Sequence, residues 1–338
     1  MELYEHGGRI QGDILDFSVN INPLGMPDKA KDVIREHIGE LEKYPDTECA
    51  GLTRKLSGHD GVKQEKIVCG NGAADLIYRI VHALKPENAL LTAPAFSEYE
   101  KALSEVGCSI RYHRLDEQND LIVGEDILES LDGVDICFLC VPNNPNGALI
   151  PRELMDRICD KCQSSGTLLV LDECFLGFCK EQISPQLTEN MIKLRAFTKL
   201  YAMAGLRLGY ALCGSKAIAE RIRRTGQCWS VSVPAQLAGA AALADGKYLA
   251  DTVSLISRER EYLRSSLEKT GIKVYPSDCN FLLLRYNKRL DTLLLNKGIA
   301  VRSCSNFRGL DETYFRIAVR RHEENERLIA AINSITGE

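Results

Sequence analysis

The stretch Arg195-Ala-Phe-Thr-Lys-Leu-Tyr-Ala-Met-Ala-Gly-Leu-Arg-Leu-Gly-Tyr210 decides how the rest of the chain is interpreted. The apolar run from Met191 to Phe197 leads into Thr198-Lys199, and Arg207 follows Lys199 by eight positions. A lysine at the end of a buried strand is costly as a free ammonium, because burial disfavours the charged form. That cost disappears if the amine forms a Schiff base with an aldehyde cofactor. On its own, however, Lys199 is more simply explained as one of many surface lysines.

The overall composition is that of an ordinary soluble globular protein. The chain has 338 residues, which is enough for two domains. Of these residues, 45% are hydrophobic and 26% are charged. Its net charge of -5 gives no reason to expect nucleic acid or an anionic membrane as a partner. Met1-Glu-Leu-Tyr-Glu5 carries acids where a signal peptide carries bases, and the small apolar run from Ala235 to Ala244 is too short to cross a bilayer. We therefore expect a cytoplasmic protein that binds neither nucleic acid nor a membrane.

The thirteen cysteines are scattered, and an odd number in a chain of this length does not indicate a disulfide framework. Cys137 and Cys140 have a CxxC spacing but fall in a strand-like run, so their side chains should point to opposite faces. Cys159 and Cys162 should share one helical face, but no second pair of cysteines or histidines completes a zinc site at the usual spacing. We expect reduced thiols and no metal.

The first 27 residues are expected to form an arm, because Asn20-Ile-Asn-Pro-Leu-Gly25 is rich in turn-forming residues. Pro27 and Asp28 then open a helix that ends at Tyr44-Pro45-Asp46. Its apolar residues repeat at helical spacing, namely Ala30, Val33, Ile34, Ile38 and Leu41. After the arm, 1–27, we predict a large domain at 28–230 and a smaller domain at 231–338.

Short apolar runs alternate with helical patterns between residues 66 and 225. The seven runs are 66–69, 89–92, 109–112, 135–140, 167–171, 191–197 and 208–212, and the helical patterns fall at about 73–85, 97–106, 151–164 and 215–225. This alternation predicts an α/β fold with a mainly parallel seven-stranded sheet that is covered on both faces. Ligand groups should then lie in the loops that leave the strand ends.

The pattern changes after Trp229. A long helical pattern from Pro234 to about Thr270 predicts a single connecting helix. Strand-like runs follow at 280–285, 298–302 and 313–319, and a last helix is expected from Glu323. These elements predict a smaller α+β C-terminal domain.

The loop Gly70-Asn-Gly-Ala-Ala-Asp75 leaves the first strand and opens a helix. Glycines let the backbone approach a phosphate, and the free N–H groups and the helix dipole favour an anion. Because any turn from strand to helix can use glycine, this loop alone is weak evidence for phosphate binding. A dinucleotide fingerprint is disfavoured, since Asp75 stands where its third glycine would be.

Three further turns carry candidate ligand groups. Phe96, after the second strand, could stack on a flat cofactor, although such a ring more often belongs to a core. Asn144, after the fourth strand, could bond a ligand phenolate or only serve a turn. Asp172 ends the fifth strand, where a carboxylate is costly unless it is paired, and a protonated pyridine nitrogen is a suitable partner. Four such turns, after the first, second, fourth and fifth strands, together with Lys199 and Arg207 after the sixth, indicate one ligand site.

In order and spacing, Asn144-Pro-Asn-Gly147, Asp172 and Thr198-Lys199 with Arg207 match landmarks of the fold-type I pyridoxal-phosphate enzymes, the aminotransferase superfamily. The chain resembles this family over nearly its whole length, and the resemblance implies pyridoxal 5'-phosphate as cofactor. Lys199 would hold the cofactor as a Schiff base, and Asp172 would keep its pyridine nitrogen protonated. The other implied ligands are Phe96 on the ring, Asn144 on the phenolate, and Gly72, Ala73, Ala74, Thr198 and Arg207 on the phosphate.

Tyr44, in Lys43-Tyr-Pro-Asp46, matches a family tyrosine that reaches the phosphate from the neighbouring subunit. The resemblance therefore implies a homodimer with shared active sites.

Within this family, the chain is most similar to the histidinol-phosphate aminotransferase branch and, more narrowly, to the threonine-phosphate decarboxylases of cobalamin biosynthesis. The most telling segment is His6-Gly-Gly8, because ordinary aminotransferases lack this arm. The resemblance implies decarboxylation of L-threonine O-3-phosphate to (R)-1-amino-2-propanol O-2-phosphate. The implied substrate ligands are Arg316 for the carboxylate, His6 and Arg302 for the phosphate, and Asn22 in the closing arm.

Two positions depart from the family pattern. Phe175 stands where many aminotransferases have a tyrosine on the cofactor phenolate, and the loss of that hydroxyl should raise the pKa of the Schiff base. Ala196 stands where relatives often have a hydroxyl for the cofactor phosphate. Neither change removes an essential group.

The reaction itself stays open between two chemistries. Lys199 and Arg316 could serve a decarboxylase or an aminotransferase, so the identity of these residues does not choose between them. A third reading is a protein that binds the cofactor without turnover, as a regulator would. Regulators of this superfamily carry a DNA-binding head, and we do not expect residues 1–27 to form one.

Overall fold

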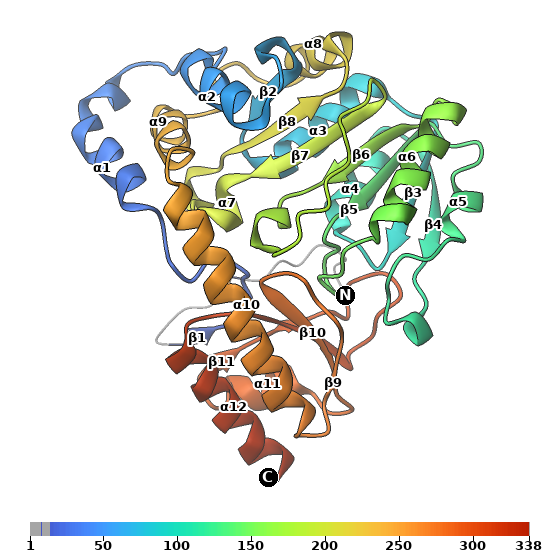
Figure 1. Ribbon diagram of the computed structural model, residues 1–338, viewed down its shortest axis with the longest axis vertical. Helices are drawn as coiled ribbons and strands as arrows, with labels where there is room; N and C mark the ends of the chain where they lie inside the picture. The colour runs from blue at the N-terminus through green and yellow to red at the C-terminus, as the bar shows by residue number, and fades with distance from the viewer. Residues whose placement is uncertain (1–7, 9–13, 338) are drawn as a thin grey trace.

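A seven-stranded sheet forms the centre of the larger part of the molecule, as the computed structural model in Figure 1 shows. The structure describes residue 8 and residues 14–337. The strands lie in the order β2-β8-β7-β6-β5-β3-β4. Their bounds are β2 Ile67–Gly70, β3 Asn88–Ala93, β4 Ser109–Arg114, β5 Ile136–Cys140, β6 Leu168–Asp172, β7 Met191–Ala196 and β8 Gly209–Cys213.

Only β8 runs against its neighbours in this sheet. It pairs antiparallel with both β2 and β7, whereas every other pair is parallel. All seven predicted runs became strands of this sheet, and the predicted α/β fold with a mainly parallel seven-stranded sheet is confirmed.

Helices cover both faces of the sheet, because neighbouring strand residues point to opposite sides. One face packs against α3 Gly72–Leu84, α4 Ser97–Glu105 and α8 Lys216–Arg224, and the other against α5 Ile127–Ser130 and α6 Arg152–Ser165. The β5 cysteines show the alternation: Cys137 lies in the α5–α6 core and Cys140 in the α3–α4 core. Their expected placement on opposite faces is therefore confirmed.

All thirteen cysteines are free thiols in the structure. Among the described residues, no group of histidine, cysteine or acidic side chains is arranged to hold a metal ion. None of the helices formed within residues 14–337 combines the length and the apolar character that a bilayer crossing demands.

The predicted helix after Pro27 is shorter than its apolar stripe. Helix α1 covers Asp28–Glu36 and a 3-10 turn, η1, covers Ile38–Glu42. Ala30 is buried against the rest of the chain, but Ile38 and Leu41 are 60% and 48% exposed. The second half of the stripe therefore has no core to hold it in an α-helix within this chain.

The predicted single helix from Pro234 to Thr270 is wrong, because two helices occupy this region. Helix α9 covers Val233–Ala242 and α10 covers Gly246–Glu268. Between them, the Asp245 carboxylate accepts a hydrogen bond from the Tyr248 backbone N–H and so caps the start of α10. Helix α10 then runs from the large sheet into the C-terminal part of the molecule (Figure 1).

The C-terminal part contains a four-stranded antiparallel sheet in the order β12-β13-β10-β9. Its strands are β9 Lys273–Val274, β10 Phe281–Arg285, β12 Arg302–Ser303 and β13 Tyr314–Ala318, and its helices are α11 Leu290–Leu295 and α12 His322–Thr336. The predicted run 298–302 is divided between two sheets: β11 Ile299–Ala300 pairs with β1 Leu15–Asp16 of the arm, and Arg302 begins β12. This division joins the arm to the C-terminal part and brings Arg302 beside Arg316.

The remaining elements are short or lie at the margins of the sheets. They are α2 Ala50–Asp60, η2 Gln64–Lys66, η3 Glu117–Asn119, η4 Leu176–Phe178, α7 Phe197–Leu200 and η5 Ala204–Leu206.

Candidate active site

A cavity of about 340 Å³ lies at the carboxyl ends of the parallel strands. Phe96, Asn144, Asp172 and Lys199 line it. Phe96 and Asn144 lie in the loops after β3 and β5, Asp172 is the last residue of β6, and Lys199 lies in α7 directly after β7. Arg302 and Arg316 from the C-terminal sheet and residues 18–20 of the arm also line it. The cavity is thus where the ligand groups of an α/β sheet are expected.

The amino end of α3 forms one wall of the cavity. Ala73 and Ala74 line it together with Thr198 and Arg207. The Arg207 guanidinium lies so close to Gly72 that a Cβ there would stand 2.8 Å from its Nη2, and Gly72 has a φ of +85°. Backbone N–H groups at a helix start and a guanidinium make this wall suited to an anion such as phosphate.

Asp172 is a buried carboxylate, with 5% of its surface exposed. It accepts hydrogen bonds from the Tyr99 hydroxyl, at 2.6 Å, and from the Cys174 backbone N–H, at 3.0 Å. Burial raises the pKa of Asp172 in spite of these two donors. A cation in the cavity would stabilise the ionised carboxylate, so the site favours a positively charged ligand atom at this point.

Lys199 lies in α7, directly after β7, and is half-buried. Burial, with the nearby charges of Arg316 and Arg207, lowers its pKa to about 8. A larger fraction of its amine is therefore neutral near pH 7 than in an ordinary lysine, which is the form that attacks a carbonyl.

Asn144 is presented by a loop that its neighbours hold in place. The Asn143 amide donates to the Pro94 carbonyl and to Asn146 Oδ1, and the Asn146 amide donates to the Leu121 carbonyl. Gly147 has a φ of +79° and lies against Ser277, where a Cβ would come within 2.2 Å of the hydroxyl oxygen. Asn143 and Asn146 thus hold the turn together, whereas Asn144 lines the cavity.

Arg316 and Arg302 stand opposite each other on neighbouring antiparallel strands. Arg316 is buried, donates to Asn144 Oδ1 at 2.5 Å and to the Ser18 carbonyl at 3.1 Å, and its Nε has no hydrogen-bond partner. Burial lowers the pKa of Arg316 to about 10. Two guanidinium groups side by side, one with an unused buried donor, suit a ligand with anionic groups.

Two predicted site residues, Asn22 and Tyr44, lie elsewhere, and a third falls on a part of the chain that the structure does not describe. His6 is outside the described residues. The Asn22 side chain is buried away from the cavity lining, where its amide donates to the Leu200 carbonyl and the Thr252 hydroxyl. Tyr44 is 80% exposed and stacks on Trp229 at a ring distance of 4.7 Å, so it is no part of the cavity of its own chain.

The two departures from the family pattern both line the cavity. Phe175 packs edge-on against Phe281, with ring centroids 5.1 Å apart, and offers no hydroxyl there. Ala196, the last residue of β7, offers none either.

Several cavity residues were not predicted from the sequence. They include Tyr99, which donates a hydrogen bond to Asp172, and Ser18, Asn20 and Asn306, which line the cavity from the arm and the C-terminal part. Tyr99 follows Phe96 by three positions at the start of α4, so helical spacing alone placed it on the same side. Asn20 and Asn306 carried no signal, because only the tertiary fold brings them to this cavity.

Comparison with known proteins identifies the family. The model of the aminotransferase class I and II family matches residues 12–332. The chain belongs to this family. Family membership gives pyridoxal 5'-phosphate as the cofactor of the enzyme.

Relatives within the family carry two different activities. The threonine-phosphate decarboxylase of Salmonella typhimurium is 38% identical, over 98% of this chain and 97% of that protein. The histidinol-phosphate aminotransferase of Methanosarcina mazei is 33% identical, over 94% of this chain and 87% of that protein.

Solved structures of both kinds of enzyme are similar to this chain. The histidinol-phosphate aminotransferase of Clostridium acetobutylicum superposes with a TM-score of 0.90 at 30% identity, covering 96% of this chain and 99% of its own. The L-threonine-O-3-phosphate decarboxylase of Porphyromonas gingivalis gives 0.87 at 27% identity, covering 96% and 100%. Overall similarity therefore establishes a pyridoxal-phosphate enzyme and leaves its reaction to the site.

The cavity fits this cofactor on its own chemistry. Burial raises the pKa of the Asp172 carboxyl, and a pyridinium nitrogen beside it would stabilise the ionised form. The wall formed by α3 and Arg207 suits a phosphate, and Lys199 is a depressed-pKa amine suited to an aldehyde. The three functional groups of the cofactor thus each have a matching side of the cavity.

Proposed function

We propose that the enzyme decarboxylates L-threonine O-3-phosphate to (R)-1-amino-2-propanol O-2-phosphate, a reaction of cobalamin biosynthesis. The observation that carries the proposal is the pair Arg302 and Arg316, which face each other in register and both line the cavity. Threonine phosphate carries two anionic groups, a carboxylate and a phosphate, and so matches two guanidinium groups. Histidinol phosphate carries only the phosphate.

Similarity to known decarboxylases supports the same choice. The Salmonella typhimurium decarboxylase, at 38% identity, is more similar in sequence than the Methanosarcina mazei aminotransferase at 33%. The His6-Gly-Gly8 segment, which suggested this branch, lies almost wholly outside the described residues. The arm residues that follow it line the cavity through Ser18, Val19 and Asn20.

In this proposal, each cavity wall binds one part of the cofactor. Lys199 would bind the aldehyde carbon, Asp172 would pair with the ring nitrogen, and Phe96 would stack on the ring. Asn144 would donate to the phenolate oxygen, and its Oδ1 already accepts from Arg316. The phosphate would be bound by the backbone of Gly72, Ala73 and Ala74 with Thr198 and Arg207. Bound in this way, the cofactor supplies an electron sink for the bond that breaks at the substrate α-carbon.

The remaining groups would orient the substrate. Arg316 would bind the carboxylate through the Nε that lacks a partner in the structure. Arg302, with His6, would bind the phosphate. Because burial strengthens each charge-assisted bond, the position of the two arginines would determine which bond of the substrate reacts.

The competing function is a histidinol-phosphate aminotransferase, which the Clostridium acetobutylicum structure favours by its TM-score of 0.90. A direct comparison separates the two. Decarboxylation predicts CO₂ release from threonine phosphate with no oxo-acid present. Turnover of histidinol phosphate that requires 2-oxoglutarate, without CO₂, would overturn the proposal. A yellow protein that loses its colour on Lys199→Ala but converts neither amine would instead indicate cofactor binding without turnover.

We also propose that the enzyme is a homodimer in which Tyr44 reaches the phosphate of the partner's cofactor. Ile38, Leu41, Tyr44 and Trp229 are 60%, 48%, 80% and 50% exposed in the single chain. Large apolar and aromatic side chains exposed near each other favour a protein interface. The thirteen free thiols support a reducing compartment, the cytoplasm, as the place of action.

A further inference from the structure

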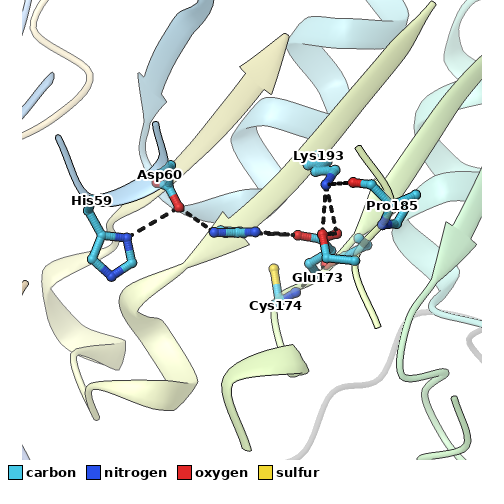
Figure 2. A network of polar contacts seen from close by, with 9 residues as sticks. His59, Asp60, Glu173, Cys174, Pro185 and Lys193 are labelled. Carbon is cyan, nitrogen blue, oxygen red and sulfur yellow. Dashed lines mark hydrogen bonds and ion pairs between the residues drawn. The ribbon is translucent and has the colours of Figure 1, made fainter. Parts of the chain in front are cut away.

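A buried cluster of charged side chains lies beside the candidate active site but outside its cavity lining (Figure 2). Its centre is the ion pair between Arg195 and Glu173, in which Nε and Nη2 of the arginine donate to Glu173 Oε2 at 2.9 and 2.8 Å. Arg195 Nη1 also binds Asp60, at the end of α2. On the far side, Lys193 lies 3.7 Å from Glu173 Oε1 and binds the Pro185 carbonyl. Ser184 donates to Glu173 Oε1 at 2.5 Å.

The cluster is buried and electrically balanced. The side chains of Glu173, Asp60 and Lys193 are 1%, 3% and 7% exposed, and that of Arg195 is 26% exposed. Two carboxylates stand against two cations, with His59 contacting Asp60 at the rim. Removal of one partner leaves an uncompensated buried charge, which acts over a long range because water does not screen it.

The central pair joins the two strands that carry the main cofactor ligands. Glu173 directly follows Asp172, and Arg195 lies four positions before Lys199. The Glu173 backbone N–H donates to the Leu194 carbonyl at 2.9 Å, so the parallel ladder of β6 and β7 continues to this point. The side chains of Glu173 and Arg195 then link the two strands by an ion pair close to the point where both strands end.

We propose that Glu173 and Arg195 are positioning residues for the cofactor: their ion pair clamps the ends of β6 and β7, and its charge balance sets the electrostatic environment of Asp172 and Lys199. This proposal rests on the assignment of those two residues as cofactor ligands. It does not depend on which reaction the enzyme catalyses.

Other polar and charged groups also face Asp172 and Lys199, the two residues proposed to bind the cofactor. Lys199 is faced by Arg316, Arg207 and the Cys174 thiol. Asp172 is faced by Tyr99, by Cys174 and by Glu173, whose negative charge raises the pKa of Asp172. The cluster therefore adds to the electrostatic field that these groups create at Asp172 and Lys199. Glu173 and Arg195 lie outside the cavity lining, so they would touch neither cofactor nor substrate.

The charge balance predicts the direction in which each substitution shifts the pH midpoint of the cofactor absorption band. Glu173→Gln leaves one excess positive charge and should lower the pH midpoint at which the absorption band of the bound cofactor titrates. Arg195→Met leaves one excess negative charge and should raise that midpoint. The double variant restores the balance and should return the midpoint toward the wild-type value. Each single shift is expected to be on the order of half a pH unit.

The test is a spectrophotometric pH titration of the cofactor-loaded enzyme, with the cofactor dissociation constant measured alongside. Each single variant should also bind the cofactor roughly tenfold more weakly, because the strand ends are no longer clamped. A role in folding alone would lower stability in both variants without opposite shifts of the midpoint. Equal or absent shifts in the two single variants would overturn the proposal.

Two further variants keep the test decisive. Glu259→Gln removes a carboxylate that is equally buried and ion-paired, between α10 and α12, and should leave the titration unmoved. If Arg195→Met does not fold, Asp60→Asn leaves an excess positive charge further from the site and should lower the midpoint by less than Glu173→Gln. If the absorption band of the bound cofactor persists unchanged in Lys199→Ala, the assignment of Lys199 as a cofactor ligand is itself refuted.

Discussion

At the scale of single residues, the proposed role of Lys199 requires a neutral amine, because only that form attacks an aldehyde. Lys199 also lies close to arginines that suit anionic groups. Burial and the charges of Arg316 and Arg207 lower its pKa to about 8, so the same arginines that favour anions also favour the free amine. The arrangement thus serves binding and reactivity with the same charges.

This environment predicts a pH dependence for cofactor capture by the apoenzyme. The rate should rise with pH and reach half its maximum near pH 8, because only the neutral amine of Lys199 reacts. Arg316→Met removes a positive charge and should move this midpoint upward. Arg264→Met, on the exposed side of α10, is the control and should not move it. A midpoint above pH 10 in the wild type would contradict the depressed pKa of Lys199.

Tyr99 gives a second prediction at this scale. Tyr99→Phe removes the 2.6 Å hydrogen bond to Asp172 and should raise the pKa of that carboxyl further. Loss of a bond to a buried charge costs about 1.5–3 kcal/mol, so cofactor affinity should fall roughly 10- to 100-fold in equilibrium dialysis. Tyr275→Phe, which loses a 3.0 Å bond to Glu117 away from the cavity, should bind the cofactor normally. Equal affinities in the two variants would speak against a role for Tyr99.

The presence of polar cavity residues at strand ends could be predicted from the sequence, because a polar residue at the end of a buried run needs a partner. Asp172 and Lys199 are of this kind. Asn20 could not be predicted, since an asparagine in a turn is common without any ligand. Tyr99 had only its helical spacing from Phe96 as a signal, and a tyrosine in a helix is common without a ligand nearby. Asn22 was expected near the substrate, but its amide serves the backbone of Leu200 instead.

At the scale of elements, the seven strands were predictable because each is a short apolar run flanked by turns or by a helical pattern. The break between α9 and α10 was not, because Asp245-Gly246 also fits within a helical pattern. An aspartate caps the start of a helix only when its own backbone is non-helical, and the sequence pattern does not show this. The division of 298–302 between two sheets likewise depends on the arm, which pairs through β1.

The contact between β8 and α3 gives a prediction at this scale. A Cβ at Gly209 would lie 2.6 Å from the Ala73 backbone nitrogen, so Gly209→Ala must displace the amino end of α3. We expect a loss of about 1–3 kcal/mol in the free energy of unfolding and weaker cofactor binding, measured by urea denaturation and dialysis. Gly58→Ala, in α2, meets nothing within 4 Å and should be neutral or slightly stabilising. A Gly209→Ala variant with normal cofactor affinity would argue against a phosphate site at this helix start.

At the scale of the whole molecule, the cavity is closed by chain segments that are far apart in sequence. The large sheet supplies the groups proposed to bind the cofactor, and the C-terminal sheet supplies Arg302 and Arg316. The arm joins the two, since β1 pairs with β11 and the Ser18 carbonyl accepts from Arg316. Residues 198–207 would look nearly the same in an aminotransferase, whereas the choice of reaction depends on groups from these other segments.

The exposed apolar residues predict the oligomeric state. The native mass should be twice the 37.6 kDa of one chain by light scattering, because Ile38 and Leu41 need a partner surface. Leu41→Glu should shift the protein toward the monomer. Leu295→Glu alters a leucine of similar exposure, 49%, on α11 and should leave the mass unchanged. A wild-type monomer at micromolar concentration would contradict the proposed dimer.

The reaction is tested most directly by the stoichiometry of CO₂ release. Cofactor-loaded enzyme is incubated with L-threonine O-3-phosphate labelled at its carboxyl carbon, with no oxo acid present, and the released label is compared with the amine formed. The account predicts one CO₂ for each molecule of 1-amino-2-propanol O-2-phosphate, and loss of both products on Arg316→Met. Amine substrate consumed only when 2-oxoglutarate is added, with the label retained in solution, would contradict it.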